Sequence, residues 1–259
     1  METGDFNNSV IEYENTNPSV RLSAGDHALH YLTPNRVCLH RVLTLMTKEP
    51  DTIIWLDSMP EGCVFLDVGA NVGMYSVYAG VLRKANVYAF EPEAQNYALL
   101  CRNLVLNGLN AQAVAWCAAL SDAMSFERIY LSDSITGGSC HSFGESVDAY
   151  LKPYDAPLSQ GCYATTIDHL VNSGTMEVPT YIKIDVDGFE HKVIHGAAET
   201  LRNPAVRSLL IEINSHLPEH MAIVETLAAL GFQHDPHQFE GAQRKEGLFK
   251  GVGEYVFRR

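Results

Sequence analysis

The 259-residue sequence lacks the cysteine motifs that mark several common protein classes. Its six cysteines form no C-x-x-C pair, which excludes a zinc knuckle or a dithiol redox motif of that spacing. Several cysteines lie in apolar runs, as buried reduced thiols do. This usage favours a reducing compartment, and we expect a cytoplasmic protein.

Long hydrophobic runs and positive charge are also scarce. No apolar run approaches the roughly 20 residues that a membrane-spanning helix needs. The first twenty residues lack the basic and apolar regions of a secretory signal. Lys and Arg number 18 against 31 Asp and Glu, so the formal net charge is −13. This balance disfavours non-specific binding of nucleic acid or anionic membranes, and we expect a neutral or cationic small-molecule ligand.

The order of segments predicts an α/β fold. Residues 1 to about 35 are polar and indicate an irregular arm or lid, and helices are expected over 37–48 and 51–59. We therefore divide the chain into an N-terminal arm and helix (1–50), forming a lid or substrate-pocket element, and a main domain (51–259). In the main domain β-rich runs alternate with helical periodicity, which predicts a doubly wound, mostly parallel sheet. Its strands are expected at 63–67, 87–91, 113–120, 181–188 with the exit turn, and 208–214, followed by two short late strands.

The segment FLDVGANVG (65–73) carries the clearest chemical signal. A strand runs into Asp67, and the turn from Gly69 through Ala70 and Asn71 to Gly73 opens a helix. Glycine at the turn lets the backbone approach a ligand closely. Glu91 ends the next strand, where a carboxylate can accept both hydroxyls of a ribose.

The charge of this turn limits which classes of ligand it can bind. A dinucleotide site would show G-x-G-x-x-G, because the pyrophosphate needs a second close glycine and a helix N-terminus. Here the turn reads GANVG, and Asp67 would repel a pyrophosphate but not a sulfonium. S-adenosylmethionine, a nucleoside with a cationic end and no phosphate, meets both conditions.

Several segments together resemble one family: FLDVGANVGMYSVYAG, AFEPEAQNYALLCRNLVLNG, ATTIDHL, YIKIDVDGFEHKVIHGAAETL and LLIEIN. The sequence from about residue 50 onward is similar to FkbM-type S-adenosylmethionine-dependent methyltransferases. The resemblance implies a Rossmann-like sheet of seven strands with the last antiparallel, and methyl transfer to oxygen, often on sugars or secondary metabolites. It also implies which residues bind the cofactor: Asp67, Gly69, Asn71 and Gly73 in the loop, Glu91 on the ribose, and Pro92, Ala119 and Leu120 along the adenine.

The segment KIDVDGFE, at the end of the fourth strand, offers catalytic carboxylates. Asp185 lies where the family's fourth strand meets the active site, and we select it as the first catalytic candidate. Lys183, Asp185 and Asp187 share one face if the strand stays extended. The alternatives are a structural Lys183–Asp185 ion pair, with Asp187 and Glu190 starting a helix at its favourable end.

The segment EINSH, at the end of the fifth strand, suggests a metal site or a base. Glu212 and Asn214 would lie near Asp185, and such oxygen ligands can hold Mg²⁺. Hydrogen bonding at the sheet edge is the alternative that we prefer. His216 follows directly, and among the 11 histidines it is our candidate general base. An ordinary surface histidine is the competing interpretation.

Two other functions stay open. The fold also suits a nucleotide-binding oxidoreductase, although GANVG argues against it. A non-catalytic S-adenosylmethionine-binding domain is the third possibility, although Asp67, Gly69, Glu91 and Asp185 are all present. We expect residues 1–35 and 132–160, a long loop without clear periodicity, to shape the pocket of a small-molecule or sugar acceptor.

Overall fold

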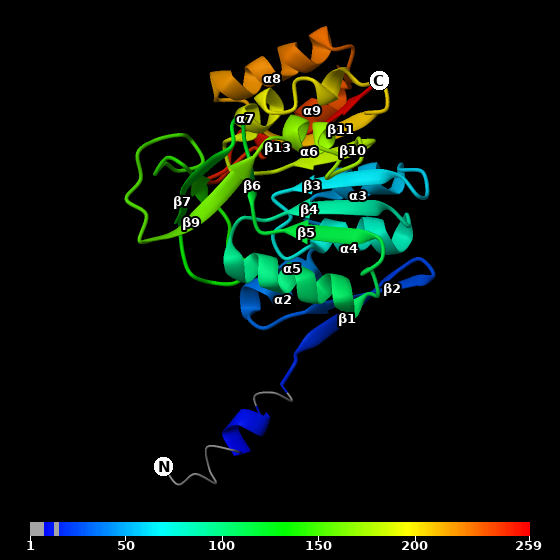
Figure 1. Ribbon diagram of the computed structural model, residues 1–259, viewed down its shortest axis with the longest axis vertical. Coiled ribbons are helices and arrows are strands. Elements are labelled where there is room, and N and C mark those ends of the chain that lie inside the picture. Colours follow the sequence, from blue (N-terminus) through cyan, green and yellow to red (C-terminus); the bar gives the residue numbers. More distant parts are fainter. Residues whose placement is uncertain (1–7, 13–15) are drawn as a thin grey trace.

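The computed structural model describes residues 8–12 and 16–259. It is built around a mixed seven-stranded sheet in the order β12-β13-β11-β10-β3-β4-β5, shown in Figure 1. Four neighbouring pairs are parallel, whereas β13 runs antiparallel to both β11 and β12. The strands are β3 (Val64–Val68), β4 (Asn86–Phe90), β5 (Ala113–Trp116), β10 (Tyr181–Ile184), β11 (Ser208–Asn214), β12 (Gln233–His234) and β13 (Val252–Arg258).

Helices cover both faces of this sheet, and each face has its own hydrophobic core. Neighbouring residues of β3 point to opposite sides: Phe65 belongs to one buried cluster, and Leu66 and Val68 to the other. The first core also contains residues of α2 (Arg36–Leu43), α3 (Pro50–Asp57), α4 (Met74–Leu82) and α5 (Ala94–Leu106). The second contains residues of α6 (Ile167–Asn172), α7 (Glu190–His195), the 3₁₀ turn Thr200–Arg202 and α8 (Pro218–Ala229). The α9 helix (Pro236–Ala242) packs on β13. The predicted α/β architecture with helices on both faces is therefore confirmed.

A second, four-stranded sheet was not predicted. It consists of β6 (Ala119–Leu120), β9 (Leu158–Thr165), β7 (Ser125–Leu131) and β8 (Ser142–Phe143), in that order. The expected strand 113–120 is consequently wrong, because it divides between the two sheets after Trp116. The expected loop 132–160 is also partly wrong, since it contains β8 and the start of β9. The antiparallel pairing of β7 with β9 joins segments far apart in sequence, which local periodicity does not reveal.

Residues 19–32 of the N-terminal region form a hairpin, and residues 8–12 are helical. The strands β1 (Ser19–Ala24) and β2 (His27–Leu32) pair antiparallel, so the expectation of an irregular arm is wrong for these residues. Residues 1–7 and 13–15 of that arm lie outside the described residues. Asparagines of α5 hold the hairpin: Asn103 Oδ1 accepts from the Leu32 amide and Asn107 Oδ1 from the His30 amide, both at 2.9 Å. The hairpin is thus docked on the sheet's helical layer, and the division at residue 50 stays a prediction.

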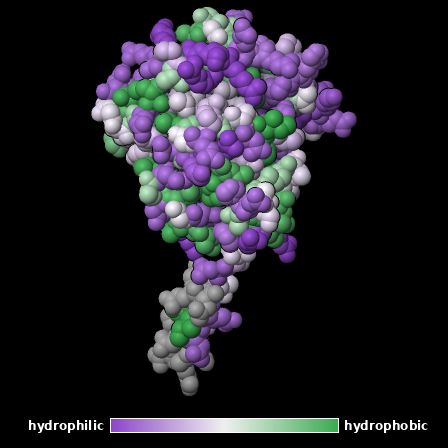
Figure 2. All heavy atoms as spheres, turned by 90° about the vertical axis from the view of Figure 1, so that its right-hand side faces the viewer, coloured by the Kyte–Doolittle hydropathy of each residue, from purple (hydrophilic) through white to green (hydrophobic). Residues whose placement is uncertain are grey.

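The surface agrees with the composition. On the face shown in Figure 2, hydrophilic and hydrophobic residues are interspersed. Among the described residues, no helix is long and apolar enough to cross a membrane.

Candidate functional site

A cavity of about 400 Å³ opens at the carboxyl ends of the parallel strands. Gly69 follows β3, Glu91 follows β4 and Asp185 follows β10, and all three line the cavity together with Glu212 of β11. Doubly wound sheets bind ligands at this edge, and the volume lies within the range of small-molecule sites. Four of the predicted chemical groups thus meet in one place.

The turn after β3 passes very close to the end of β10. Gly69 has φ +78°, and a Cβ placed there would lie 1.8 Å from the carbonyl oxygen of Asp185. The amides of Gly69 and Ala70 both donate to the Phe90 carbonyl at 3.0 Å. Glycine is required here for its backbone conformation and for the space, so the turn forms a close-fitting wall of the cavity.

Substituting Gly69 by alanine should therefore be much more damaging than a conformational penalty alone. Gly62 is a matched control, because it has φ +74° but nothing within 4 Å of an added Cβ. We expect Gly62→Ala to lower the free energy of unfolding by about 1–2 kcal/mol, the cost of a left-handed residue. Gly69→Ala should cost at least a further ~2 kcal/mol, because backbone must move. Equal losses in denaturant titrations would contradict the close approach.

Glu91 is held at the cavity wall by backbone amides. Its two carboxylate oxygens accept from the amides of Asn71 at 2.8 Å and of Glu93 at 2.9 Å. Burial raises the pKa of Glu91 to about 7, although these hydrogen bonds favour the charged form. Each oxygen keeps a lone pair for a further donor. Two hydroxyls on neighbouring carbons of a ligand could each donate to one of these oxygens.

Asn71 links the turn to the long segment beyond β7. It adopts φ +50°, and its side-chain nitrogen donates to the Gly138 carbonyl at 2.7 Å. The same segment binds α5, since the Gly137 amide donates to Asn96 Oδ1 at 2.6 Å. Residues 138–141 accordingly line the cavity, which agrees with the expectation for 132–160.

The other predicted cofactor residues fall into two groups. Pro92, Ala119 and Leu120 line the cavity beside Glu91. Asp67, Ala70 and Gly73 do not, and they lie beneath or within the turn. Asp67 accepts from the Ser76 hydroxyl at 2.6 Å, and a Cβ on Gly73 would lie 2.5 Å from Leu100 Cδ1. Their geometry fits a role in supporting the turn.

Asp185 is an ionised carboxylate in the cavity wall. Burial disfavours its charge, but the Lys183 ammonium at 2.8 Å more than compensates and lowers the pKa of Asp185. Lys183 is almost fully buried, and the ion pair that the sequence analysis gave as the alternative is present. The pair does not occupy all of Asp185, whose side chain is 29% exposed toward the cavity.

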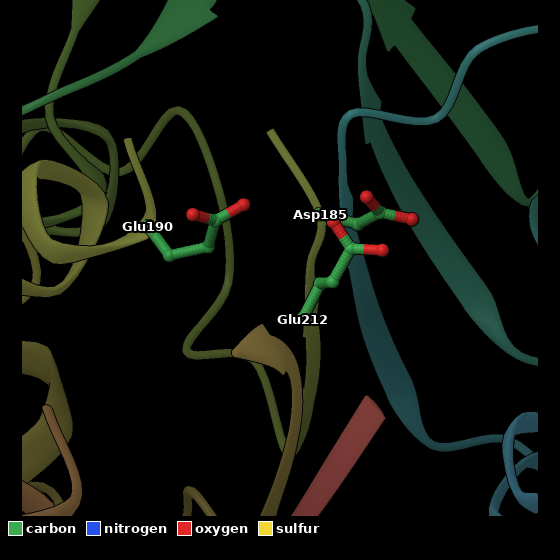
Figure 3. Close-up of side chains that lie close together, drawn as sticks. All are labelled: Asp185, Glu190 and Glu212. Atoms are coloured by element: carbon green, nitrogen blue, oxygen red, sulfur yellow. The ribbon is translucent and has the colours of Figure 1, made fainter. Parts of the chain in front are cut away.

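Three carboxylates converge at this point. Oxygens of Asp185, Glu190 and Glu212 lie within 4.8 Å of one another. Figure 3 shows the three side chains. Each already has protein partners: Asp185 accepts from Lys183, and Glu212 lies 3.3 Å from an Arg244 nitrogen. Glu190 is fully buried and accepts from backbone amides. Because these carboxylates already have protein partners, they do not support the magnesium hypothesis.

Asn214, the third expected metal ligand, belongs to a different network. Its side-chain oxygen accepts from the His216 amide at 3.0 Å, and its backbone amide donates to His220 Nδ1 at 3.0 Å. His220 in turn lies 3.1 Å from Glu190. This buried chain joins β11, α8 and the start of α7, and it fixes the exit of β10 beside the cavity.

His216, the candidate general base, does not line the cavity. Its imidazole lies against Gly251, where a Cβ would approach Nε2 to 2.6 Å. The strand end that suggested His216 turns away from the cavity at Asn214. Two other histidines, His40 and His141, line the cavity instead.

Asp187 has the properties of a proton acceptor. It adopts φ +55°, lines the cavity and accepts from the Cys140 amide at 2.7 Å. Burial and the neighbouring Asp185 charge raise the pKa of Asp187 to about 7. The spacing in KIDVDG predicts that this residue shares a strand face with Asp185, and helix initiation is the alternative. The left-handed turn that directs it into the cavity has no sequence signal apart from the following glycine.

Comparison with known proteins agrees with this geometry. The crystal structure of Methyltransferase FkbM from Methylobacillus flagellatus KT matches with a TM-score of 0.51 at 14% identity, over 78% of this chain and 44% of that one. This likeness shows a Rossmann-like methyltransferase fold. The family model "Methyltransferase FkbM domain" matches residues 67–234, which is more than half of the chain. The protein therefore belongs to the FkbM methyltransferase family.

Two curated relatives extend the comparison. Hexuronic acid methyltransferase AglP of Haloferax volcanii is 27% identical over 169 residues, covering 64% of this chain and 63% of the relative. AMB antimetabolite synthetase AmbE of Pseudomonas aeruginosa is 26% identical over 255 residues, covering 83% of this chain but 12% of the relative. The chain spans less than two thirds of the length of either relative.

Proposed function

We propose that the protein is an S-adenosylmethionine-dependent methyltransferase that methylates a hydroxyl oxygen of a small molecule or sugar. The orientation of Glu91 by two backbone amides at the cavity wall carries the proposal. Its free lone pairs fit the two hydroxyls of a ribose, and the glycine turn beside it admits a ligand closely. The cofactor would supply the electrophilic sulfonium methyl.

The residues beyond Glu91 suit the remainder of that reaction. Asp185 holds a negative charge at the end of β10, which would favour a cationic sulfur nearby. Asp187, with its pKa of about 7, would accept the proton of an acceptor hydroxyl near neutral pH. In-line displacement requires the acceptor oxygen to be aligned with the methyl group and the sulfur. The hydrogen-bonded network that fixes the end of β10 suits this requirement.

A sugar acceptor is favoured by one relative. AglP is named as a hexuronic acid methyltransferase, and that protein aligns with 64% of this chain. Four phenylalanines line the cavity and offer apolar surface to a ring: Phe90, Phe143, Phe189 and Phe249. We therefore place a sugar hydroxyl first among the acceptors.

Calorimetric titration and methyl-transfer assays test the proposal. We expect S-adenosylhomocysteine to bind and NAD not to bind, and we expect labelled S-adenosylmethionine to methylate at least one member of a hydroxyl-acceptor panel. Binding of NAD alone would favour the oxidoreductase. Cofactor binding without turnover on any acceptor would favour a non-catalytic binding domain.

A further inference from the structure

Basic side chains gather around the cavity of this acidic protein. The cavity is lined by His40, Arg41, Lys48, Lys192 and Arg244, although the chain carries a net charge of −13. The first three come from α2 and the residues that follow it. The overall negative charge predicted a neutral or cationic ligand, but the cavity holds more basic side chains than that overall charge indicates.

Three of these cations already have fixed partners. Lys48 pairs with Glu49 at 2.6 Å, Lys192 with Glu145 at 2.6 Å, and Arg244 with Glu254 at 3.0 Å. Two of them also lie over aromatic rings, Lys192 at 4.7 Å from Phe189 and Arg244 at 5.6 Å from Phe249. Their charges are largely compensated within the protein.

Arg41 differs from these three. Within the described part of the chain, no carboxylate lies within 4.0 Å of its guanidinium, and its one hydrogen bond runs from Nε to the Gly137 carbonyl at 2.6 Å. That bond fixes the plane of the group, while both terminal nitrogens keep their donors. The side chain is half-buried at the cavity wall.

The charge of Arg41 acts on Asp185 and Asp187, the carboxylates that we place beside the transferred methyl group. Its charge opposes the rise in the pKa of Asp187 that burial causes, and it also favours the ionised form of Asp185. The segment that Arg41 anchors continues to Gly138, which Asn71 of the cofactor turn holds. Arg41 is thus near the proposed methyl acceptor and rigidly placed.

We propose that the acceptor carries an anionic group, a carboxylate or a phosphate, and that the terminal nitrogens of Arg41 bind it. This inference rests on the proposed methyl transfer, because it concerns the acceptor side of the same cavity. A guanidinium with two free parallel donors matches both anions in bidentate geometry. The half-buried position of Arg41 strengthens such a contact, because less water competes for its nitrogens there than at the open surface.

Three sugars that differ at carbon 6 test the inference by calorimetry. Glucuronic acid carries a carboxylate, glucose 6-phosphate a phosphate, and glucose a neutral hydroxymethyl group. With the protein saturated with S-adenosylhomocysteine, we expect one of the anionic sugars to bind at least tenfold more tightly than glucose. The better anion identifies the source of the charge. Equal affinities, tighter binding of glucose, or no binding of any sugar would overturn the inference.

Matched variants assign the effect to Arg41. Arg36 is an exposed arginine of the same helix that does not line the cavity, so Arg36→Gln removes the same charge elsewhere. We expect Arg41→Gln to abolish the preference for the anion, Arg41→Lys to retain part of it, and Arg36→Gln to leave it intact. A loss in Arg36→Gln as large as in Arg41→Gln, or an unchanged preference in Arg41→Gln, would refute the assignment.

The two proposals fail in different ways. If S-adenosylhomocysteine does not bind the wild-type protein, the proposed function fails, and the sugar titrations are then read on the protein alone. If S-adenosylhomocysteine binds but no anion is preferred, only the acceptor class is wrong.

Discussion

Replacing Asp185 by asparagine should slow methyl transfer by about 10²-fold or more, the scale of positioned electrostatic and acid–base effects. The substitution keeps the shape of the side chain and an oxygen for Lys183, but it removes the charge that faces the cavity. Cofactor affinity should change little by comparison, because Glu91, which follows β4, provides the ribose contact that we propose.

Single-turnover rates and S-adenosylhomocysteine titrations separate these effects. Asp155→Asn is the control, since Asp155 is exposed and does not line the cavity. Denaturant titration must accompany them, because a buried Lys183 loses part of its compensation in Asp185→Asn. Wild-type turnover in a folded Asp185→Asn variant would show that the end of β10 is structural.

The same assay decides the role of metal. Lys183, Arg244 and the amides around Glu190 already satisfy the acidic cluster, so we expect turnover to be insensitive to EDTA. Loss of activity in EDTA and its return with Mg²⁺ would reinstate Asp185 and Glu212 as metal ligands.

Local patterns predicted those parts of the site that are continuous in sequence. The strand and glycine turn at 65–73, Glu91 eighteen residues beyond Gly73, and Asp185 after the fourth strand all lie where the alternation placed them. Each depends on a strand end in a parallel sheet, and parallel strands end at one edge. The hydrophobic periodicity and the turn residues are therefore sufficient to predict these parts of the site.

The remainder depends on pairings between distant segments. The antiparallel pairing of β7 with β9, the docking of Gly137 on α2, and the bond from Asn71 to Gly138 join residues far apart in the chain. No sequence pattern consequently marks Arg41 as a residue of the cavity, since arginine is common in amphipathic helices. His216 illustrates the opposite error, because proximity in sequence to β11 does not give proximity to the cavity.

Cofactor binding should depend on pH through Glu91. Its pKa of about 7 is raised by burial, so the empty site holds a largely protonated carboxyl at pH 6 and a largely ionised one at pH 8. Because the folded pKa lies above the unfolded value, the contribution of Glu91 to folding is present below that unfolded value and declines as the pH rises through 7. Ribose hydroxyls would stabilise the ionised form, so we expect S-adenosylhomocysteine to bind roughly tenfold more tightly at pH 8 than at pH 6.

The variant Glu91→Gln tests this assignment better than alanine does. Alanine would leave the amides of Asn71 and Glu93 without their acceptor, whereas glutamine keeps one oxygen for them. We expect Glu91→Gln to bind S-adenosylhomocysteine at least ~10-fold more weakly, since charge-assisted hydrogen bonds contribute about 1.5–3 kcal/mol. It should also lose most of the pH dependence. Glu93, a buried carboxylate that caps α5 outside the cavity, provides the control. Glu93→Gln should keep the affinity at pH 8 and a pH dependence of similar size, displaced to lower pH because the Glu93 charge helps to raise the pKa of Glu91. A pH profile shared by wild type and Glu91→Gln would place the ribose contact elsewhere, because the titrating group would then be another one.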